Sequence, residues 1–383
     1  MRKPLAAWQR FALGFENNRP GWATGQWFTL NAVVEIRGPL DVRRLDQAFR
    51  QLVDRNDVLR TRIEDGEQVI RPEVPTELEL VDESDSDELL FAPVEFTAMS
   101  PIRLRLAAPE PGRHLLCLHL HHMLADPATL WIVLNELAAL YRGPLPAPLA
   151  QFWQYAEDQG RLIADGRTAA EAWWRKVSGP SASPAVTPEG QYALRQRILT
   201  ADELSELERF SRRNRSTVLI SLLAAVACAA LPYLGPGDTV LFNTLFSRRN
   251  RIEWRALPGP CTVPAYLPLP RPPASLTGDY VAAVRDVVLA AQHHVMDPPT
   301  DDASSPFVEY IIDSRPQALA FGEAVGAVID AAGSRDIGRA ARFDIRFRRT
   351  GEGELFAHLS GDGIGWPQER ALAICASLPW RKS

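Results

Sequence analysis

The sequence predicts a mixed α/β fold divided into two lobes. Segments with a strand pattern alternate with segments with a helix pattern in both halves of the chain, and no repeat of fixed period is present. Residues 178–190 are rich in Ser, Pro, Ala and Gly, which is typical of a linker between domains. We therefore expect an N-terminal lobe at 1–177, a linker at 178–190 and a C-terminal lobe at 191–383. At 383 residues, the chain is long enough to give each lobe its own core.

The elements of the N-terminal half follow from β-branched runs and helical spacing. The expected strands are 31–36, 58–63, 102–106 and 115–121, the last two joined by a Pro-Gly turn at 109–112. Asp41 is placed to cap a helix whose apolar residues recur at a spacing of three to four. A second helix is expected from Pro127 to Tyr141, where Gly143 and Pro144 end it.

The C-terminal half repeats the alternation. The expected helices are 201–213, 217–231, 278–294 and 368–378, and the expected strands are 239–246, 307–312, 343–348 and 355–359. The helix at 217–231 is nearly all apolar, so we expect it to be buried in the core. It is too short to cross a bilayer.

Composition excludes several classes of protein. The formal net charge of −5 argues against a nucleic-acid partner. Two short arginine clusters, at 212–215 and 247–251, are interpreted as solvated faces, with a basic patch for an acidic partner as the alternative. The four cysteines form no C-x-x-C pair, which favours a reducing cytoplasm over disulfides or structural zinc. No apolar stretch follows the N-terminus, so neither a signal peptide nor membrane association is expected.

The segment at 118–127, Leu-His-Leu-His-His-Met-Leu-Ala-Asp-Pro, concentrates the residues that could do chemistry. If the strand pattern continues, His122 lies on the apolar face of Leu116, Leu118 and Leu120. Burial there disfavours a charged imidazole, and a neutral imidazole at a strand end is suited to act as a general base. The alternative is a core histidine with a structural role.

Other chemistries in this segment are less well supported. His119 and His121 share a strand face that excludes His122, and no cysteine lies at ligand spacing, so we expect no metal site. No G-x-S-x-G motif is present, and Cys117 lies in an apolar run where a thiol stays protonated. Asp126 has a sufficient structural role as a helix cap, with Pro127 at the first helical position.

The run His121-His122-Met-Leu-Ala-Asp126-Pro127 resembles the HHxxxDG signature of the condensation domains of nonribosomal peptide synthetases. Their relatives, the polyketide-associated and wax-ester acyltransferases, often have HHxLADG. Further family landmarks follow in order along nearly the whole chain. They are Gly38-Pro39-Leu40-Asp41, Leu52 to Thr61, Gly235 to Val240, Ser247-Arg248, Leu257 to Leu269, Ala291 to His294, and Phe343-Asp344-Ile345.

The resemblance implies two chloramphenicol-acetyltransferase-like lobes in a V-shaped pseudo-dimer, with the active site in a tunnel between them. The acyl donor would be a thioester on the phosphopantetheine of an acyl or peptidyl carrier protein, or on coenzyme A, with no cofactor of the enzyme's own. His122 would assist attack by a small-molecule amine or alcohol, with His121 supporting it. Asp126 would hold the loop through an arginine, for which Arg248 is the first candidate and Arg249 the next.

Three departures from the family pattern bear on function. Pro127 replaces the motif's glycine and removes a backbone N–H near the histidine. Cys261-Thr262 stands where an asparagine is expected, and the N-terminal SxAQxR motif is only loosely present in Leu5 to Arg10.

Three hypotheses follow from the motif and its departures. The first is a free-standing, monomeric acyltransferase that forms an amide or ester in natural-product, including antibiotic, biosynthesis. The second is a catalytically degenerate domain that binds a carrier protein or recruits a tailoring enzyme. The third uses the same tunnel for cyclisation, dehydration or hydrolytic release.

Overall fold

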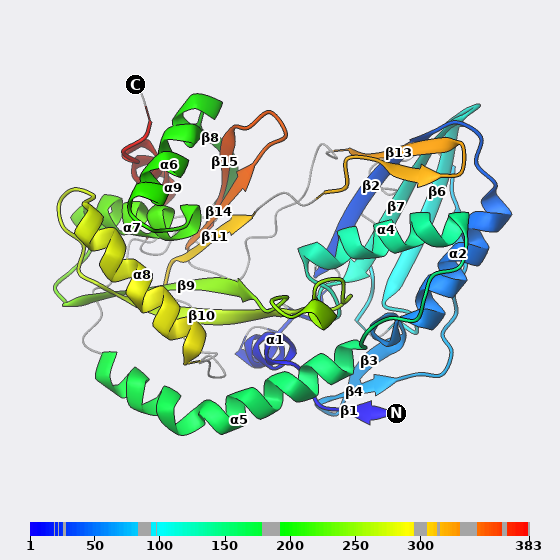
Figure 1. Ribbon diagram of the computed structural model, residues 1–383, viewed down its shortest axis with the longest axis horizontal. Helices are drawn as coiled ribbons and strands as arrows, with labels where there is room; N and C mark the ends of the chain where they lie inside the picture. The colour runs from blue at the N-terminus through cyan, green and yellow to red at the C-terminus, as the bar shows by residue number, and fades with distance from the viewer. Residues whose placement is uncertain are drawn as a thin grey trace. The chain divides into compact units, whose positions relative to one another are not determined.

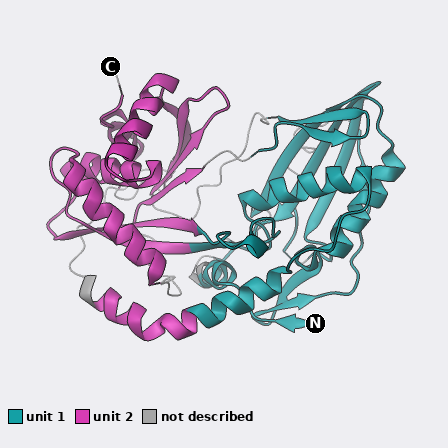
Figure 2. Ribbon diagram, viewed as in Figure 1, with its two compact units in different colours: residues 1–162, 247–263, 314–334 teal, residues 163–246, 264–313, 335–383 magenta. Residues whose placement is uncertain are grey.

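The computed structural model describes residues 1–18, 20–21, 23–25, 28–82, 93–96, 98–177, 192–294, 305–311, 315–329, 343–361 and 366–381. The chain forms two compact units, each described here by itself (Figure 2). Unit 1 comprises residues 1–162, 247–263 and 314–334. Unit 2 comprises residues 163–246, 264–313 and 335–383.

These units differ from the contiguous lobes that the sequence suggested. Residues 247–263 and 314–334, both from the C-terminal half of the chain, belong to unit 1. Residues 314–334 belong to unit 1 because the strand β13 (Ala324–Ile329) pairs antiparallel with β2 (Thr29–Arg37). The expected linker at 178–190 lies outside the described residues.

Unit 1 is built on a six-stranded sheet with the order β12-β13-β2-β7-β6-β5 (Figure 1). Its remaining strands are β12 (Leu319–Phe321), β7 (Arg113–His121), β6 (Ile102–Glu110) and β5 (Leu78–Leu80). A smaller sheet has the order β1-β4-β3, formed by β1 (Arg2–Lys3), β4 (Glu67–Ile70) and β3 (Thr61–Glu64). The strands expected at 31–36, 102–106 and 115–121 are thus confirmed. At 58–63 the prediction is partly wrong, because Asp57–Arg60 is a 3-10 helix and the strand begins at Thr61.

Two helices of unit 1, α2 (Val42–Arg55) and α4 (Pro127–Arg142), pack on one face of the large sheet (Figure 1). The unit also contains α1 (Ala7–Asn18) and the first part of α5 (Phe152–Val177). Leu116, Leu118 and Leu120 of β7 are buried in one core cluster with residues of α2 and α4, whereas Cys117 belongs to a separate small cluster on the opposite face. The alternation read from the sequence therefore holds along β7 and places the end of this strand beside the start of α4.

Unit 2 has its own six-stranded sheet, with the order β10-β9-β11-β14-β15-β8. The strands are β10 (Thr262–Pro270), β9 (Thr239–Ser247), β11 (Phe307–Ile311), β14 (Phe343–Arg349), β15 (Leu355–Gly361) and β8 (Tyr192–Leu199). The helices that share its core are α6 (Ala201–Arg213), α7 (Val218–Ala230), α8 (Gly278–His293) and α9 (Gln368–Ala376). The expectation of a buried apolar helix is confirmed in α7, most of whose residues are buried.

Within the part of the chain that the structure describes, no single helix is both long and apolar enough to cross a membrane. The pair of helices formed by Ala201–Arg213 and Val218–Tyr233 meets the length and composition test only when taken together, and it is bent by 100°.

Candidate functional site

The loop that follows β7 carries the two adjacent histidines and is held by hydrogen bonds from both sides. β7 ends at His121, so His122 lies in the turn rather than on the strand. The His122 backbone N–H donates to the carbonyl of Phe28 at 2.8 Å, and the indole Nε1–H of Trp8 donates to the His122 carbonyl at 3.2 Å. Gln9, which is fully buried, donates to the carbonyl of Met123. The N-terminal helix α1 thus anchors the histidine loop.

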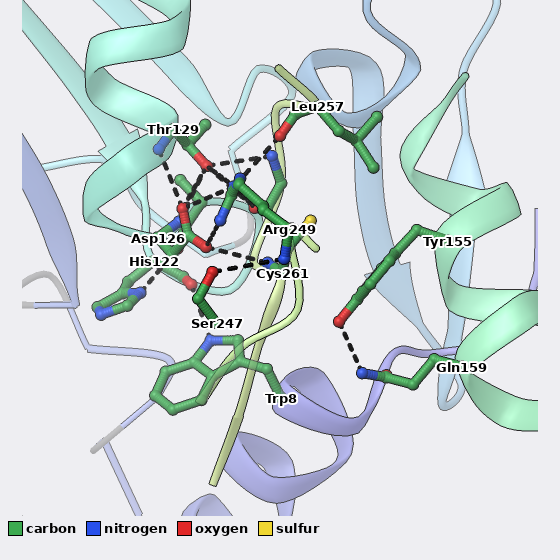
Figure 3. Close-up of polar contacts among 12 residues, drawn as sticks. Trp8, His122, Asp126, Thr129, Tyr155, Gln159, Ser247, Arg249, Leu257 and Cys261 are labelled. Atoms are coloured by element: carbon green, nitrogen blue, oxygen red, sulfur yellow. Dashed lines mark hydrogen bonds and ion pairs between the residues drawn. The ribbon is translucent and has the colours of Figure 1, made fainter. Parts of the chain in front are cut away.

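The His122 ring has a defined protonation pattern. Its Nδ1 lies 2.8 Å from the carbonyl oxygen of Ala125 (Figure 3). A carbonyl oxygen only accepts hydrogen bonds, so Nδ1 must carry the proton and, in the neutral ring, Nε2 carries the lone pair. The ring is half-buried, with the rings of Trp8 and Phe28 at centroid distances of 5.1 and 4.7 Å. His122 is therefore oriented to accept a proton at Nε2.

His121 has the opposite pattern. Its Nδ1 accepts the backbone N–H of Met123 at 3.2 Å, so the neutral ring carries its proton on Nε2. The side chain is 2% exposed and contacts the rings of Phe28 and Phe96. Burial, and secondarily the neighbouring His122, lower the pKa of His121 to about 3. The Nδ1 lone pair of His121 is thus engaged by a backbone N–H of the loop, and the lowered pKa favours a neutral ring at physiological pH.

Asp126 joins helix α4 to the segment at 247–263. It is the N-cap of α4, accepting the backbone N–H of Thr129 at 3.0 Å within a capping box. It also pairs with Arg249, whose Nη2 lies 2.9 Å from Oδ1, and accepts the backbone N–H of Cys261 at 3.0 Å (Figure 3). The carboxylate is 1% exposed. Both roles inferred for Asp126, as a cap and as an arginine partner, appear in the structure.

The arginine that pairs with Asp126 is Arg249, so Arg248 as the first candidate was wrong and the second candidate is correct. Arg249 also donates to the carbonyls of Leu257 and Gly259, at 3.2 and 2.8 Å. Burial acts to lower the pKa of Arg249, but the charge of Asp126, the hydrogen bond to it and the nearby Cys261 and Tyr155 together outweigh burial, and the pKa is raised. Arg248 instead donates its backbone N–H to the carbonyl of Cys261, and burial lowers the pKa of its side chain.

Thr129 and Gly259 complete this network and were not singled out as site residues from the sequence. The Thr129 hydroxyl contacts the Gly259 carbonyl at 3.0 Å and accepts the Gly259 N–H at 3.1 Å. Gly259 has φ +132°, and a Cβ there would lie 2.2 Å from the ring of Phe152. Only glycine fits both the backbone conformation and the space. In the sequence, the sign of its importance was its place in the segment from Leu257 to Leu269, which resembles the family pattern.

Pro127 is the first residue of α4, as expected. Its missing N–H costs the helix nothing, because the first N–H groups of a helix have no partner within it.

Metal and thiol chemistry find little support in the described ranges. Those ranges contain no group of three or more His, Cys, Asp and Glu residues that could hold a metal ion. His119 contacts Asn31 across the β2–β7 pair, with Nδ1 at 2.7 Å from Oδ1. Burial raises the pKa of Cys117 and of Cys261 to about 12, so both thiols remain protonated.

The family model for the condensation domain matches residues 4–296. The chain belongs to the condensation-domain family. Among relatives, surfactin synthase subunit 1 of Bacillus subtilis is 28% identical over 256 residues, which are 61% of this chain and 7% of that protein. Tyrocidine synthase 2 of Brevibacillus parabrevis is 30% identical over 241 residues, which are 58% of this chain and 7% of that protein. The alignments thus span a small fraction of these synthetases.

Solved structures confirm the fold class of this condensation domain. SgcC5 from Streptomyces globisporus matches with a TM-score of 0.77 at 18% identity, covering 98% of this chain and 97% of that one. The X-domain from teicoplanin biosynthesis matches with a TM-score of 0.74 at 21% identity, covering 97% and 92%. A complex of this X-domain with OxyB is also similar. Condensation domains generally form amide or ester bonds and work with carrier-protein domains.

Proposed function

We propose that this condensation domain is an acyltransferase that joins a thioester-bound acyl group to an amine or alcohol, with His122 as the general base. The observation that supports it most is the hydrogen bond from His122 Nδ1–H to the Ala125 carbonyl. It fixes Nε2 as the basic nitrogen before any substrate arrives. A positioned base of this kind typically contributes roughly 10²–10⁴-fold in rate.

The proposed reaction proceeds by addition and elimination. The acceptor nitrogen or oxygen attacks the thioester carbonyl while Nε2 of His122 takes its proton. The tetrahedral intermediate collapses, the C–S bond breaks, and the imidazolium returns the proton to the departing thiolate. The products are an amide or ester and a free thiol, and the imidazole is regenerated neutral.

The Asp126–Arg249 pair supports this base without exchanging protons with substrate. Both side chains are largely buried, and their hydrogen bonds fix the N-cap of α4, four residues after His122. Because Ala125 lies between His122 and this cap, the pair also fixes the carbonyl that holds Nδ1. We assign Asp126 a positioning role.

We further propose that the donor is presented on the phosphopantetheine of a carrier protein, or on coenzyme A, and that the protein needs no cofactor of its own. The relatives include nonribosomal peptide and cyclodepsipeptide synthetases, which supports a carrier-bound donor in nonribosomal peptide or related polyketide biosynthesis. All four cysteines are free, as in proteins of a reducing cytoplasm.

The test uses carrier protein loaded with a panel of acyl groups, offered with amine and alcohol acceptors and followed by intact mass. The rate of acyl loss from the carrier should depend on the acceptor, and it should fall at least 100-fold in His122→Ala. The matched control is His293→Ala, which removes an exposed histidine on α8 and should leave transfer unchanged. Transfer that is equally fast in His122→Ala would overturn the assignment.

A second candidate function is that of a degenerate domain that binds a carrier or recruits a tailoring enzyme. Pro127 in place of the motif's glycine supports it, together with the similarity in fold to an X-domain. Carrier binding with no acyl loss, equal in wild type and His122→Ala, would favour this function over transfer.

A further inference from the structure

Two aromatic residues hold the His122 backbone and also place their rings against its imidazole. Phe28 accepts the His122 N–H through its carbonyl, and its ring is stacked on the imidazole at an interplanar angle of 21°. Trp8 donates its indole N–H to the His122 carbonyl, and its ring is stacked at 30°. Each neighbour therefore fixes both the peptide and the side chain of the same histidine.

We infer that Trp8 is a positioning residue for the reaction, which fixes the orientation of the His122 ring and favours its protonated form. This inference rests on the proposed function of His122 as a base. Trp8 lies on α1 and is 5% exposed, so it is a buried partner of His122 and not a wall that substrates contact.

The physical basis is the electrostatics of the indole ring. The faces of aromatic rings carry partial negative charge, and indole attracts a cation most strongly when the cation lies within about 6 Å of the ring. The 5.1 Å between the centroids of Trp8 and His122 is inside that range. The attraction is greater for imidazolium than for imidazole, so it acts when the base has received its proton. The attraction therefore raises the proton affinity of His122 during transfer.

The charged groups on α1 and at the start of α4 are engaged with other partners. On α1, Arg10 donates to the carbonyl of Leu5, and Glu16 accepts from the Gly21 N–H and the Thr24 hydroxyl. At the start of α4, Asp126 is paired with Arg249.

On β7, His121 is the titratable neighbour of His122, and it stays neutral through the pH range in which a histidine base would act. Removal of the Trp8 ring should therefore be visible in the titration of His122.

The same residue departs from the expected N-terminal motif. Where that motif has a small residue before its glutamine, this chain has Trp8 before Gln9. Gln9 holds the loop at Met123, and Trp8 adds a second anchor one residue earlier, at His122.

The test is a titration of the intact chain labelled with ¹³Cε1-histidine, in which the His122 signal is assigned from its loss in His122→Gln. Trp8→Leu removes both contacts and should lower the titration midpoint of His122 by about half a unit to one unit. Trp8→Phe keeps a ring but loses the N–H, so it should show a smaller shift. Trp174→Leu, on α5, is the control and should leave the His122 midpoint unchanged.

Kinetics provide the second readout. The acid limb of the pH profile for transfer should move in the same direction as the NMR midpoint, and kcat should fall more than KM rises. An unchanged His122 midpoint in Trp8→Leu, or in Trp8→Phe if the first variant does not fold, would overturn the inference. The titration needs no turnover, so a shifted midpoint in a protein without transfer activity would reject the proposed function while confirming the effect of Trp8 on the proton affinity of His122.

Discussion

His121 and His122 are adjacent in the chain but hold their protons on opposite ring nitrogens. The Ala125 carbonyl requires a proton on Nδ1 of His122, whereas the Met123 N–H requires a lone pair on Nδ1 of His121. Both partners are backbone groups of the turn that these residues begin. This difference supports the proposal that His122 transfers the proton and that His121 has a structural role.

The burial of His121 predicts that the protein loses stability in acid. The folded state lowers the pKa of His121 from 6.5 to about 3, so between these values the unfolded chain binds more protons. Stability is fully present above about pH 6.5 and falls by up to about 1.4 kcal/mol per pH unit below it, with no further loss below about pH 3. Urea unfolding of wild type and His121→Gln at pH 7, 5.5 and 4 measures this. The free-energy difference between them should shrink as pH falls, and a constant difference would refute the prediction.

Removing Asp126 should cost more stability than the loss of a helix cap. A cap alone typically costs about 1 kcal/mol, but Asp126→Ala also leaves Arg249 buried without its partner, which raises the expected cost to about 3–5 kcal/mol. Arg251→Met removes an exposed pair with Asp158 and should cost less than about 1 kcal/mol.

Coupling between the two buried partners can be measured by a double-mutant cycle in urea. Asp126→Ala with Arg249→Met should be less destabilised than the sum of the single variants, because the second change removes the stranded charge. Additive changes in the free energy of unfolding would contradict the pairing of Asp126 with Arg249. A loss of transfer in Asp126→Ala with an unchanged free energy of unfolding would contradict the structural role of Asp126.

Gly259→Ala should destabilise the protein by about 2–4 kcal/mol. Its φ of +132° disfavours any side chain, and the new methyl would overlap the ring of Phe152. Adding Phe152→Leu should recover part of the loss, since it relieves the overlap but not the backbone strain. The control is Gly166→Ala on α5, where nothing lies within 4 Å of an added Cβ, and it should be neutral or stabilising. Equal melting temperatures for Gly259→Ala and wild type would contradict this account.

Pro127→Gly restores a backbone N–H at the start of α4. If that N–H can donate to the developing oxyanion, transfer should be as fast as in wild type or faster, while the helix start becomes slightly less stable. Single-turnover rates and thermal melting separate the two effects. A large fall in rate in a folded variant would show that the fixed geometry of proline is part of the site.

The sequence predicted well what depends on local pattern. The alternation along β7 and the cap at Asp126 follow from neighbouring residues, and both are present. The sequence did not predict α5, which contains Gly160 and Gly166. This helix nevertheless supports the site, because the side chain of Gln159 accepts the N–H of Ala7 at the start of α1.

What the sequence left undecided depends on contacts between distant segments. Alternation along β9 ends at Ser247, so no pattern distinguishes Arg248 from Arg249 as the partner of Asp126. The pairing of β13 with β2 joins segments almost 300 residues apart, which is why the contiguous division into lobes was too simple. The tautomers of His121 and His122 could be assigned only once the structure placed the backbone groups of the turn against each ring.

The most direct measurement of the central claim is the single-turnover rate of acyl transfer from a loaded carrier, compared among wild type, His122→Ala and His121→Gln from pH 5 to 9. Loss of at least 100-fold in His122→Ala is predicted, with His121→Gln keeping the pH dependence of wild type at a reduced rate. Transfer that survives in His122→Ala and disappears in a folded His121→Gln would contradict the assignment of the base.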